Sequence, residues 1–298
     1  MFKSLFKDKG EESQEQNLSG VLRLIGDRSA GKTTYMAALA RWPNSQNTRL
    51  VEAVTASNKN GEELIKKARD ILEQGEPMKQ TPLLDNVYTL KNYSLRITLK
   101  KELVLDRKKS LVNLDISCKD YSGEFFSELL NQTDLPLFKD YLEDCLLASG
   151  ILLLIDGTAH QKDGEYARAI EKLLVELDRS EAQIQKRRIA LVLSKCELAD
   201  LWINRQKPKY VAQARFRETC RKLEFWERGG SGNIDYFAVS AFGVLGNRFP
   251  RPNSIQIERD RGGVSSVLEE PKMWRPFGLV SPIYWLCTGK RNQELDKD

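Results

Sequence analysis

The chain has 298 residues, enough for one large domain or two small ones. Hydrophobic residues make up 41% of it and charged residues 30%, which is typical of a globular protein with a sizeable core. The net charge of +5 arises from 47 basic and 42 acidic residues that are interspersed, which argues against a nucleic-acid-binding stripe. A single histidine and five scattered cysteines argue against a zinc site and indicate reduced thiols, so we expect a cytoplasmic protein.

The first segment, residues 1–18, is polar, and we expect it to form a mobile tail. The apolar and basic residues at positions 2–7 (FKSLFK) leave open a weak peripheral contact with a membrane through this N-terminus. No apolar run in the sequence approaches the roughly 20 residues that span a bilayer, so we expect no transmembrane segment.

A glycine-bounded loop follows the first apolar run, residues 19–25, and precedes a helix-like stretch, residues 32–41. Its sequence, GDRSAGKTT, has the spacing G-x-x-x-x-G-K-T, and strand, loop and helix together are the context of a Walker A phosphate loop. Successive N–H groups at the start of the helix attract phosphate oxygens. We expect Lys32 to contact the β- and γ-phosphates and Thr33 to bind Mg²⁺. The residues expected to bind a nucleotide here are Gly26, Asp27, Arg28, Ser29, Ala30, Gly31, Lys32, Thr33 and Thr34.

The rest of the chain alternates between helix-like and strand-like patterns. Residues 44–60 are rich in Asn, Ser and Thr, and we expect a loop there because Pro43 should end the first helix. The further expected helices are 61–74, 136–148, 164–179, 208–225 and 282–286. The further expected strands are 92–101, 110–118, 150–155, 188–194 and 234–240.

This alternation predicts an α/β protein with three layers, α/β/α, in which helices cover both faces of a mostly parallel sheet. The continuous apolar run at residues 150–155 is typical of a strand that is buried on both faces. We expect one domain over residues 19–290, an irregular insertion at 243–281 before the last helix, and a C-terminal tail at 291–298.

Polar residues follow three of the expected strands, at the sheet edge where such folds bind ligands. They are Asp120-Tyr121-Ser122-Gly123-Glu124, then Ser194-Lys195-Cys196-Glu197, and then Ser240-Ala241. In this order behind a Walker A loop, the chain resembles the Ras-like small GTPases. DYSG is similar to D-x-x-G, SKCE to N/T-K-x-D, and SA to the guanine-contacting S-A, and the resemblance covers roughly residues 19–290.

The resemblance is closer still to a bacterial group, the double-GTPase-like proteins associated with conflict systems. The segments DYSGEF at 120–125 and WRPFGLVSPIYWL at 274–286 are similar to motifs of that group. This likeness implies a P-loop fold, Mg²⁺-dependent binding of GTP or GDP, and GTP hydrolysis. It also implies a molecular switch that signals to a protein effector or regulator, which could be a second GTPase subunit.

The resemblance also implies roles for single residues. Asp120 would bind Mg²⁺, and the Gly123 N–H would face the γ-phosphate. Lys195 would lie along the base, and Glu197 would accept hydrogen bonds from guanine. The remaining residues of the base-binding loops would be Ser194, Ser240 and Ala241.

A second hydroxyl for Mg²⁺ is expected before the strand at 92–101. Thr81 is the preferred candidate because a threonine in a proline-bounded loop fits the family pattern. Thr48 and Thr55 are the alternatives.

Several positions depart from the Ras-like pattern. Glu197 replaces an aspartate, and Ser194 replaces Asn or Thr. Glu124 stands where the water-orienting glutamine usually sits, so we expect slow hydrolysis with Lys32, Gly123 and Glu124 as the catalytic candidates. Arg28 would either reach the γ-phosphate or point to solvent. Because of these departures, a P-loop ATPase, a nucleotide kinase and a non-hydrolysing nucleotide-bound scaffold remain rival hypotheses.

Overall fold

The computed structural model describes residues 14–45, 50–76, 90–100, 109–121, 123–131, 136–179, 187–246, 248–258 and 264–297. Thr48, Thr81 and the first 13 residues of the chain lie outside these ranges. Within the same ranges, no helix is both long and apolar enough to cross a membrane.

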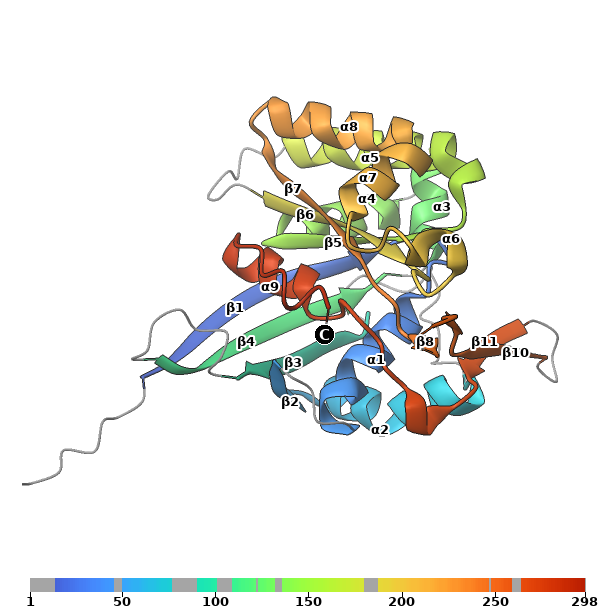
Figure 1. Cartoon of the computed structure of the whole chain (residues 1–298). Coiled ribbons are helices and arrows are strands. Elements are labelled where there is room, and N and C mark those ends of the chain that lie inside the picture. Colours follow the sequence, from blue (N-terminus) through green and yellow to red (C-terminus); the bar gives the residue numbers. More distant parts are fainter. Residues whose placement is uncertain are drawn as a thin grey trace, which may run out of the picture.

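The described residues form a seven-stranded sheet with the strand order β2-β3-β4-β1-β5-β6-β7 (Figure 1). Its strands are β1 Gln14–Ile25, β2 Val51–Ala56, β3 Asn92–Leu99, β4 Lys109–Asp120, β5 Gly150–Asp156, β6 Arg187–Ser194 and β7 Gly232–Ala238. The five strands from β4 to β7 in this order run parallel, whereas β2 and β3 are antiparallel to their neighbours. The sheet is therefore mostly parallel, as predicted, and the carboxyl ends of its five parallel strands meet at one edge.

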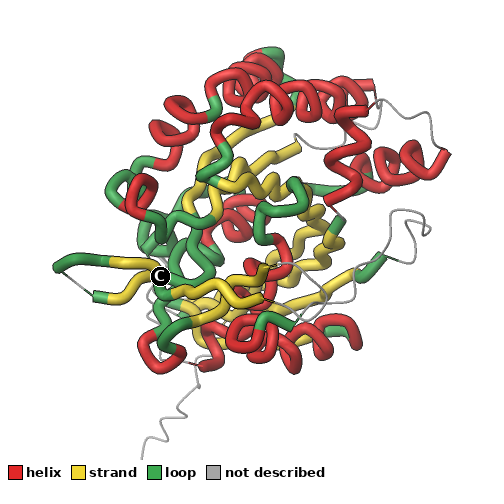
Figure 2. Tube along the Cα trace, turned by 90° about the vertical axis from the view of Figure 1, so that its right-hand side faces the viewer, coloured by secondary structure: helices red, strands yellow, loops and turns green. Residues whose placement is uncertain are grey.

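Helices cover both faces of this sheet, which confirms the predicted three layers (Figure 2). One face carries α1 Lys32–Ser45, α2 Lys59–Gln74 and α9 Ser281–Thr288. The opposite face carries α3 Gly123–Asn131, α4 Pro136–Leu146, α5 Asp163–Arg179, α7 Pro208–Arg215 and α8 Arg217–Arg228. The short elements are α6 Ala199–Trp202 and the 3₁₀ turns η3 His160–Lys162 and η4 Pro271–Met273.

The central strands supply the core on both sides because successive side chains of a strand point to opposite faces. In β5, Leu152 and Leu154 pack on the side of α1, whereas Leu153 and Ile155 pack on the side of α5. Every residue of β5 is buried. The continuous apolar run thus marks a doubly covered strand, as predicted.

The expected loop at residues 44–60 was wrong, because α1 continues through Pro43 to Ser45 and the segment contains the edge strand β2. Val51 and Val54 of β2 are buried against the core, while the other positions of this strand are at least partly exposed. A short edge strand that buries only two apolar side chains has a weak signal among polar neighbours.

The expected helix at 208–225 is two helices, α7 and α8, that meet at Phe216. Phe216 leaves the helical conformation with φ −127° and ψ 55°, and its side chain is fully buried in the core. The turn at Phe216 lets both helices cover the same face of the sheet.

The described parts of the two expected tails, residues 14–18 and 291–297, and of residues 243–281 have more structure than expected. β1 begins at Gln14, so its first residues, assigned to the tail, pair with β4. Residues 243–281 contain two small sheets, β8 Val244–Leu245 with β9 Arg251–Pro252 and β10 Ser254–Glu258 with β11 Val264–Leu268. In the expected C-terminal tail, Leu295 is buried, and Arg291 pairs with Asp235 and Asp296.

Candidate nucleotide-binding site

The phosphate loop joins β1 to α1 and requires glycine at two positions. A Cβ at Gly26 would lie 2.2 Å from the carbonyl oxygen of Leu154 on the neighbouring strand, and Gly31 has a φ of 82°. The Lys32 side chain lies across the loop and donates hydrogen bonds to the carbonyl oxygens of Gly26 at 2.8 Å and Asp27 at 3.0 Å. Its ammonium is therefore held over the loop by the backbone.

The second residue of this loop is fixed to the start of α5. The Asp27 carboxylate accepts hydrogen bonds from Lys162 Nζ at 2.6 Å, from the Tyr166 hydroxyl at 3.3 Å and from the Arg28 N–H at 2.6 Å. Burial acts to raise the pKa of Asp27, but the bonds from Lys162 and Arg28 outweigh it and hold that pKa below its usual value. Sequence reasoning missed Lys162 and Tyr166 because nothing in their local pattern links them to a loop so far away.

Asp120 ends β4, which pairs with β1 so that Asp120 lies beside Leu24. The Oδ1 atom of Asp120 is buried and has no hydrogen-bond partner among the described residues. Burial raises the pKa of Asp120 to about 6, although the charge of Lys32 opposes this. Burial likewise lowers the pKa of Lys32, and the charges of Asp120 and Asp27 oppose that shift. A cation near Oδ1 would relieve this uncompensated burial.

Gly123 begins α3 directly against the phosphate loop. An added Cβ at Gly123 would lie 2.4 Å from Arg28 Cα and 2.6 Å from Arg28 N. The structure thus brings the D-x-x-G segment into contact with the G-x-x-x-x-G-K-T loop. Glu124 follows in α3, but its side chain is not among those described.

The loop after β6 braces the phosphate loop from the other side. Ser194 Oγ lies 2.8 Å from the carbonyl oxygen of Ala30 and 3.1 Å from that of Ile155, within hydrogen-bond reach of both. Lys195 has a φ of 59° and is the one non-glycine residue with positive φ in the described part of the chain. Its ammonium donates a hydrogen bond of 2.5 Å to Asp156 at the end of β5.

Glu197 and the segment after β7 face each other. Glu197 is 5% exposed, and its Oε2 atom has no hydrogen-bond partner among the described residues. Burial raises the pKa of Glu197, while a hydrogen bond from Ser240 and the charge of Lys195 act in the opposite direction. Ser240 is fully buried and pairs through its backbone with Phe277, and the Ala241 carbonyl accepts a hydrogen bond from Trp274.

The structure therefore brings described residues of four expected segments to one sheet edge: the phosphate loop, then Asp120, Tyr121 and Gly123, then residues 194–197, and then residues 240–241. Thr55 does not belong there, because it is exposed on β2, which β3 and β4 separate from β1. Arg28 is exposed, and its side chain has no ion pair or hydrogen bond with the described residues.

Sequence reasoning missed Asp156, although a signal for it was present. The apolar run of β5 ends on this aspartate, at the same sheet edge as the other polar loops. The rule that polar residues at the carboxyl ends of parallel strands form sites applies to it equally.

A model of the family described as Double-GTPase 2 matches residues 21–228. Among solved structures, the chain is similar to the Arl6 BBS3 small GTPase from Trypanosoma brucei with bound GppNp, with 10% identity, 76% of this chain and 88% of that chain covered, and a TM-score of 0.35. It is also similar to an ADP-ribosylation-factor-like GTP-binding protein, the small COPII coat GTPase SAR1, from Encephalitozoon cuniculi in complex with GDP, with 16% identity, 76% and 70% covered, and a TM-score of 0.31.

No curated protein matches the chain. The family model, however, spans well over half of the sequence and includes the phosphate loop, Asp120, Gly123 and the loop from Ser194 to Glu197. The chain is a P-loop protein with the α/β architecture described above, and it belongs to the Double-GTPase 2 family.

Proposed function

We propose that this chain is a Mg²⁺-dependent switch that binds GTP, hydrolyses it slowly and signals to a protein partner. The observation that supports this best is a pair of buried carboxylate oxygens, Asp120 Oδ1 and Glu197 Oε2, that lack partners among the described residues. They belong to the two loops for which a metal ion and a guanine base are the expected ligands. Each ligand would supply what the buried oxygen lacks.

The residues present suit a magnesium ion. Thr33, in the first turn of α1, and Asp120 would hold Mg²⁺, which usually takes one or two protein oxygens and completes its shell with water and phosphate. When bound, Mg²⁺ would neutralise charge on the phosphates. Thr81 stays a proposal for the further hydroxyl.

The other residues of the proposed site would bind and orient the nucleotide. Main-chain N–H groups of the phosphate loop and the Lys32 ammonium would bind the phosphate oxygens. Glu197 would accept hydrogen bonds from the donors of guanine, and Ser194, Lys195, Ser240 and Ala241 would position the base. Adenine offers no matching pair of donors, so it would leave the buried Glu197 carboxylate unpaired, which is costly.

The switch would begin after Tyr121. The Tyr121 hydroxyl donates a hydrogen bond of 2.5 Å to Asp144, and its ring packs edge-on against Phe125 and Tyr141. Tyr121 is therefore fixed in the core, whereas the Gly123 N–H is the group expected to sense the γ-phosphate. We propose that Mg²⁺-GTP orders the loops near Thr81 and Gly123 and that a partner protein recognises this ordered surface.

Nucleotide titration of the purified full-length chain tests this function. We expect GTP and GDP to bind in the presence of Mg²⁺, ATP to bind at least about 100-fold more weakly, and Lys32→Ala to abolish binding, because a buried donor or acceptor left unpaired costs ~1–3 kcal/mol and several would be lost together. Lys66→Ala, an exposed lysine on α2, is the matched control.

Several results would contradict the proposal. Equal affinity for ATP would remove the assignment of Glu197 to guanine and favour a P-loop ATPase. Tight GTP binding without release of phosphate, alone or with candidate partners, would leave a nucleotide-bound scaffold, in line with Glu124 in place of glutamine.

We expect Arg28→Ala to leave the hydrolysis rate unchanged, because Arg28 is exposed.

A further inference from the structure

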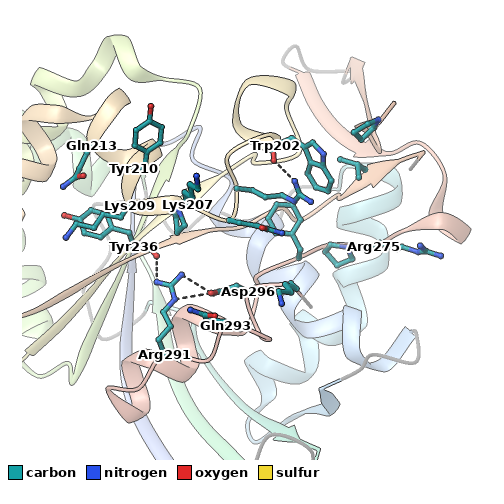
Figure 3. Close-up of a pocket in the computed structure, with 18 of the residues that line it drawn as sticks. Trp202, Lys207, Lys209, Tyr210, Gln213, Tyr236, Arg275, Arg291, Gln293 and Asp296 are labelled. Carbon is teal, nitrogen blue, oxygen red and sulfur yellow. Dashed lines mark hydrogen bonds and ion pairs between the residues drawn. The ribbon is translucent and has the colours of Figure 1, made fainter. Parts of the chain in front are cut away.

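A second concave region lies outside the proposed nucleotide site. It is a cavity of about 1200 Å³ between the loop from α6 to α7, strand β7, the residues Val244, Gly246 and Pro250, the segment 275–277 and the C-terminal residues 291–297 (Figure 3). Among its described lining residues, none belongs to the phosphate loop or to the loops at 120–124 and 194–197. The proposed function therefore gives this cavity no role.

The cavity walls carry a large excess of positive charge. The charged lining residues are six cations and one carboxylate: Arg205, Lys207, Lys209, Arg275, Arg291, Lys297 and Asp296. Arg291 is neutralised by Asp235 and Asp296, and Lys297 pairs with Glu294.

The other four cations, Arg205, Lys207, Lys209 and Arg275, have no carboxylate partner within the described ranges. Figure 3 shows Lys207 and Lys209 on one side of the cavity and Arg275 on the opposite side. Unpaired cations that surround a concave surface focus their field into it and attract anions.

Aromatic rings lie among these cations. The guanidinium carbon of Arg205 lies 3.4 Å from the centroid of the Trp202 ring, and Lys209 Nζ lies 5.5 Å from that of Tyr236. Tyr210 is 62% exposed at the rim. Proteins bind phosphorylated ligands that carry a flat ring with two kinds of group. Cations bind the phosphate groups, and aromatic rings or guanidinium planes stack on the flat ring. An acidic peptide would match the charge but would make no use of the planar faces.

The cavity also adjoins the proposed base-binding loops. Phe277 lines the cavity, and its backbone exchanges two hydrogen bonds of 3.1 Å with Ser240. The Phe277 ring packs edge-on against Trp202, with 5.6 Å between the centroids. Trp202 ends α6, the short helix that follows Glu197 along the chain. A ligand in the cavity would therefore contact the segments that hold both sides of the base-binding region.

We propose that this cavity is a second ligand site, that it binds a small phosphorylated molecule with a planar ring, in the class of nucleotides, and that its occupancy changes nucleotide release at the phosphate-loop site. The binding part of this proposal is independent of the proposed function. The coupling part rests on it.

Binding is tested on the full-length chain with Lys32→Ala, which disables the phosphate loop. The probes are ADP, inorganic tripolyphosphate and a hexaglutamate peptide, and calorimetry measures the binding of each. We expect ADP to bind saturably and more tightly than either other probe. Lys207→Glu with Lys209→Glu should weaken ADP binding about tenfold or more, because each change replaces a cation that attracts phosphate with a carboxylate that repels it. Both lysines are exposed, so the fold tolerates the change.

The matched control is Lys66→Glu with Arg168→Glu, which makes the same change in net charge at exposed positions on α2 and α5. It should change ADP affinity less than about twofold, because distant surface charges are screened by salt. Equal weakening by both double variants would overturn the site, as would the absence of saturable ADP binding. Tighter binding of hexaglutamate than of ADP would overturn the ligand class and assign the cavity to an acidic peptide.

Coupling is tested with the unmodified phosphate loop. We expect ADP to change the release rate of a fluorescent GDP analogue at least about fivefold, which is the lower end of typical coupling between two sites. The change should vanish in the Lys207→Glu, Lys209→Glu variant. An unchanged release rate would overturn the coupling, and a change that persists in the double variant would show competition at the phosphate loop. If GDP does not bind at all, the proposed function fails, whereas the calorimetric result still decides the second site.

Discussion

Lys195 donates a hydrogen bond of 2.5 Å to the carboxylate of Asp156, which joins the loop after β6 to the end of β5. The other oxygen of Asp156 accepts hydrogen bonds from the N–H and the hydroxyl of Thr158, at 2.9 Å and 2.6 Å. Lys195 also has a left-handed backbone with φ 59°, a conformation that costs free energy for a residue with a side chain. The bond to Asp156 helps to offset that cost and sets the direction of the Lys195 ammonium.

We expect Asp156→Asn to weaken guanine-nucleotide binding by about tenfold, because a charge-assisted hydrogen bond contributes ~1.5–3 kcal/mol and Lys195 would lose its fixed position. Titration with a fluorescent GDP analogue at constant Mg²⁺ measures the effect. Asp140→Asn, on the exposed side of α4, is the control and should leave affinity unchanged. Wild-type affinity in Asp156→Asn would show that the bond does not position the base-binding loop.

We predict that Asp120, the proposed metal ligand, lowers the stability of the nucleotide-free protein at neutral pH. Its pKa of about 6 in the folded protein lies above the value of about 4 in an unfolded chain. The stabilisation that comes with the raised pKa is complete below pH ~4 and is lost as the pH rises through 6, because the buried group must then ionise. Asp120→Asn avoids that ionisation.

We therefore expect Asp120→Asn to be more stable than the wild type by about 1–2 kcal/mol at pH 7.5 in the absence of nucleotide, with the difference closing as the pH falls from about 6 to about 4 and absent below that. The same variant should lose Mg²⁺-dependent nucleotide binding. Urea unfolding at a series of pH values measures the first effect and titration with and without Mg²⁺ the second. A variant that is less stable than the wild type at pH 7.5 would refute the uncompensated burial of Asp120.

A buried ion pair holds Lys119 and Tyr121, the two neighbours of Asp120 in the chain. Arg23 of β1 donates to both carboxylate oxygens of Asp144, at 2.7 Å and 3.0 Å, and Lys119 donates to the same carboxylate at 2.7 Å. Arg23 and Asp144 are 4% and 6% exposed. Burial acts to raise the pKa of Asp144, but the bonds from Lys119, Tyr121 and Arg23 outweigh it and hold that pKa below its usual value.

We expect Asp144→Ala to lower the free energy of unfolding by about 3 kcal/mol, because it leaves the buried charge of Arg23 without a counter-ion. The pair of exposed Arg179 with half-buried Glu176 is the contrast, and Glu176→Ala should cost less than about 1 kcal/mol. Urea unfolding at pH 7 compares the two variants with the wild type. Equal losses would mean that burial of the Asp144 pair has no energetic consequence.

The parts of the site that follow strands were predictable from local sequence. The phosphate loop, Asp120 and the loop from Ser194 to Glu197 each come directly after an apolar run, and parallel strands bring such ends to one edge. Asp156 gives the same signal. Local sequence was sufficient there because the neighbouring strand both positions the residue and marks it.

The residues that hold the loops of the site in place were not predictable in this way. Lys162 reaches Asp27 from the turn η3 and Tyr166 from α5, and Phe277 pairs with Ser240 from a segment that was expected to be irregular. These contacts join residues far apart in the chain, and their partners depend on how the layers pack rather than on any local periodicity. Edge strand β2 was not predicted for a related reason, because only two of its side chains are buried.

Gly123 has no room for a side chain, since a Cβ there would lie 2.4 Å from Arg28 Cα. We expect Gly123→Ala to push α3 away from the phosphate loop, because the opposing atoms are backbone and cannot rotate aside. In the proposed site the Gly123 N–H faces the γ-phosphate, which GTP carries and GDP lacks. GTP affinity should therefore fall at least about tenfold and GDP affinity much less, since loss of a charge-assisted hydrogen bond costs ~1.5–3 kcal/mol.

Gly164→Ala in α5 is the matched control for that variant, because its Cβ would meet only the Glu218 carboxylate of α8, at an ordinary 3.6 Å. Alanine is preferred to glycine inside a helix by about 0.5–1 kcal/mol, so this control should be as stable as the wild type or slightly more stable, with unchanged nucleotide affinity. Titration of both variants with GDP and with a non-hydrolysable GTP analogue separates the two phosphates. If Gly123→Ala weakened GDP and GTP equally, the contact between Gly123 and Arg28 would shape the phosphate loop as a whole and would carry no information about the γ-phosphate, and the proposed switch would have to lie elsewhere in the chain.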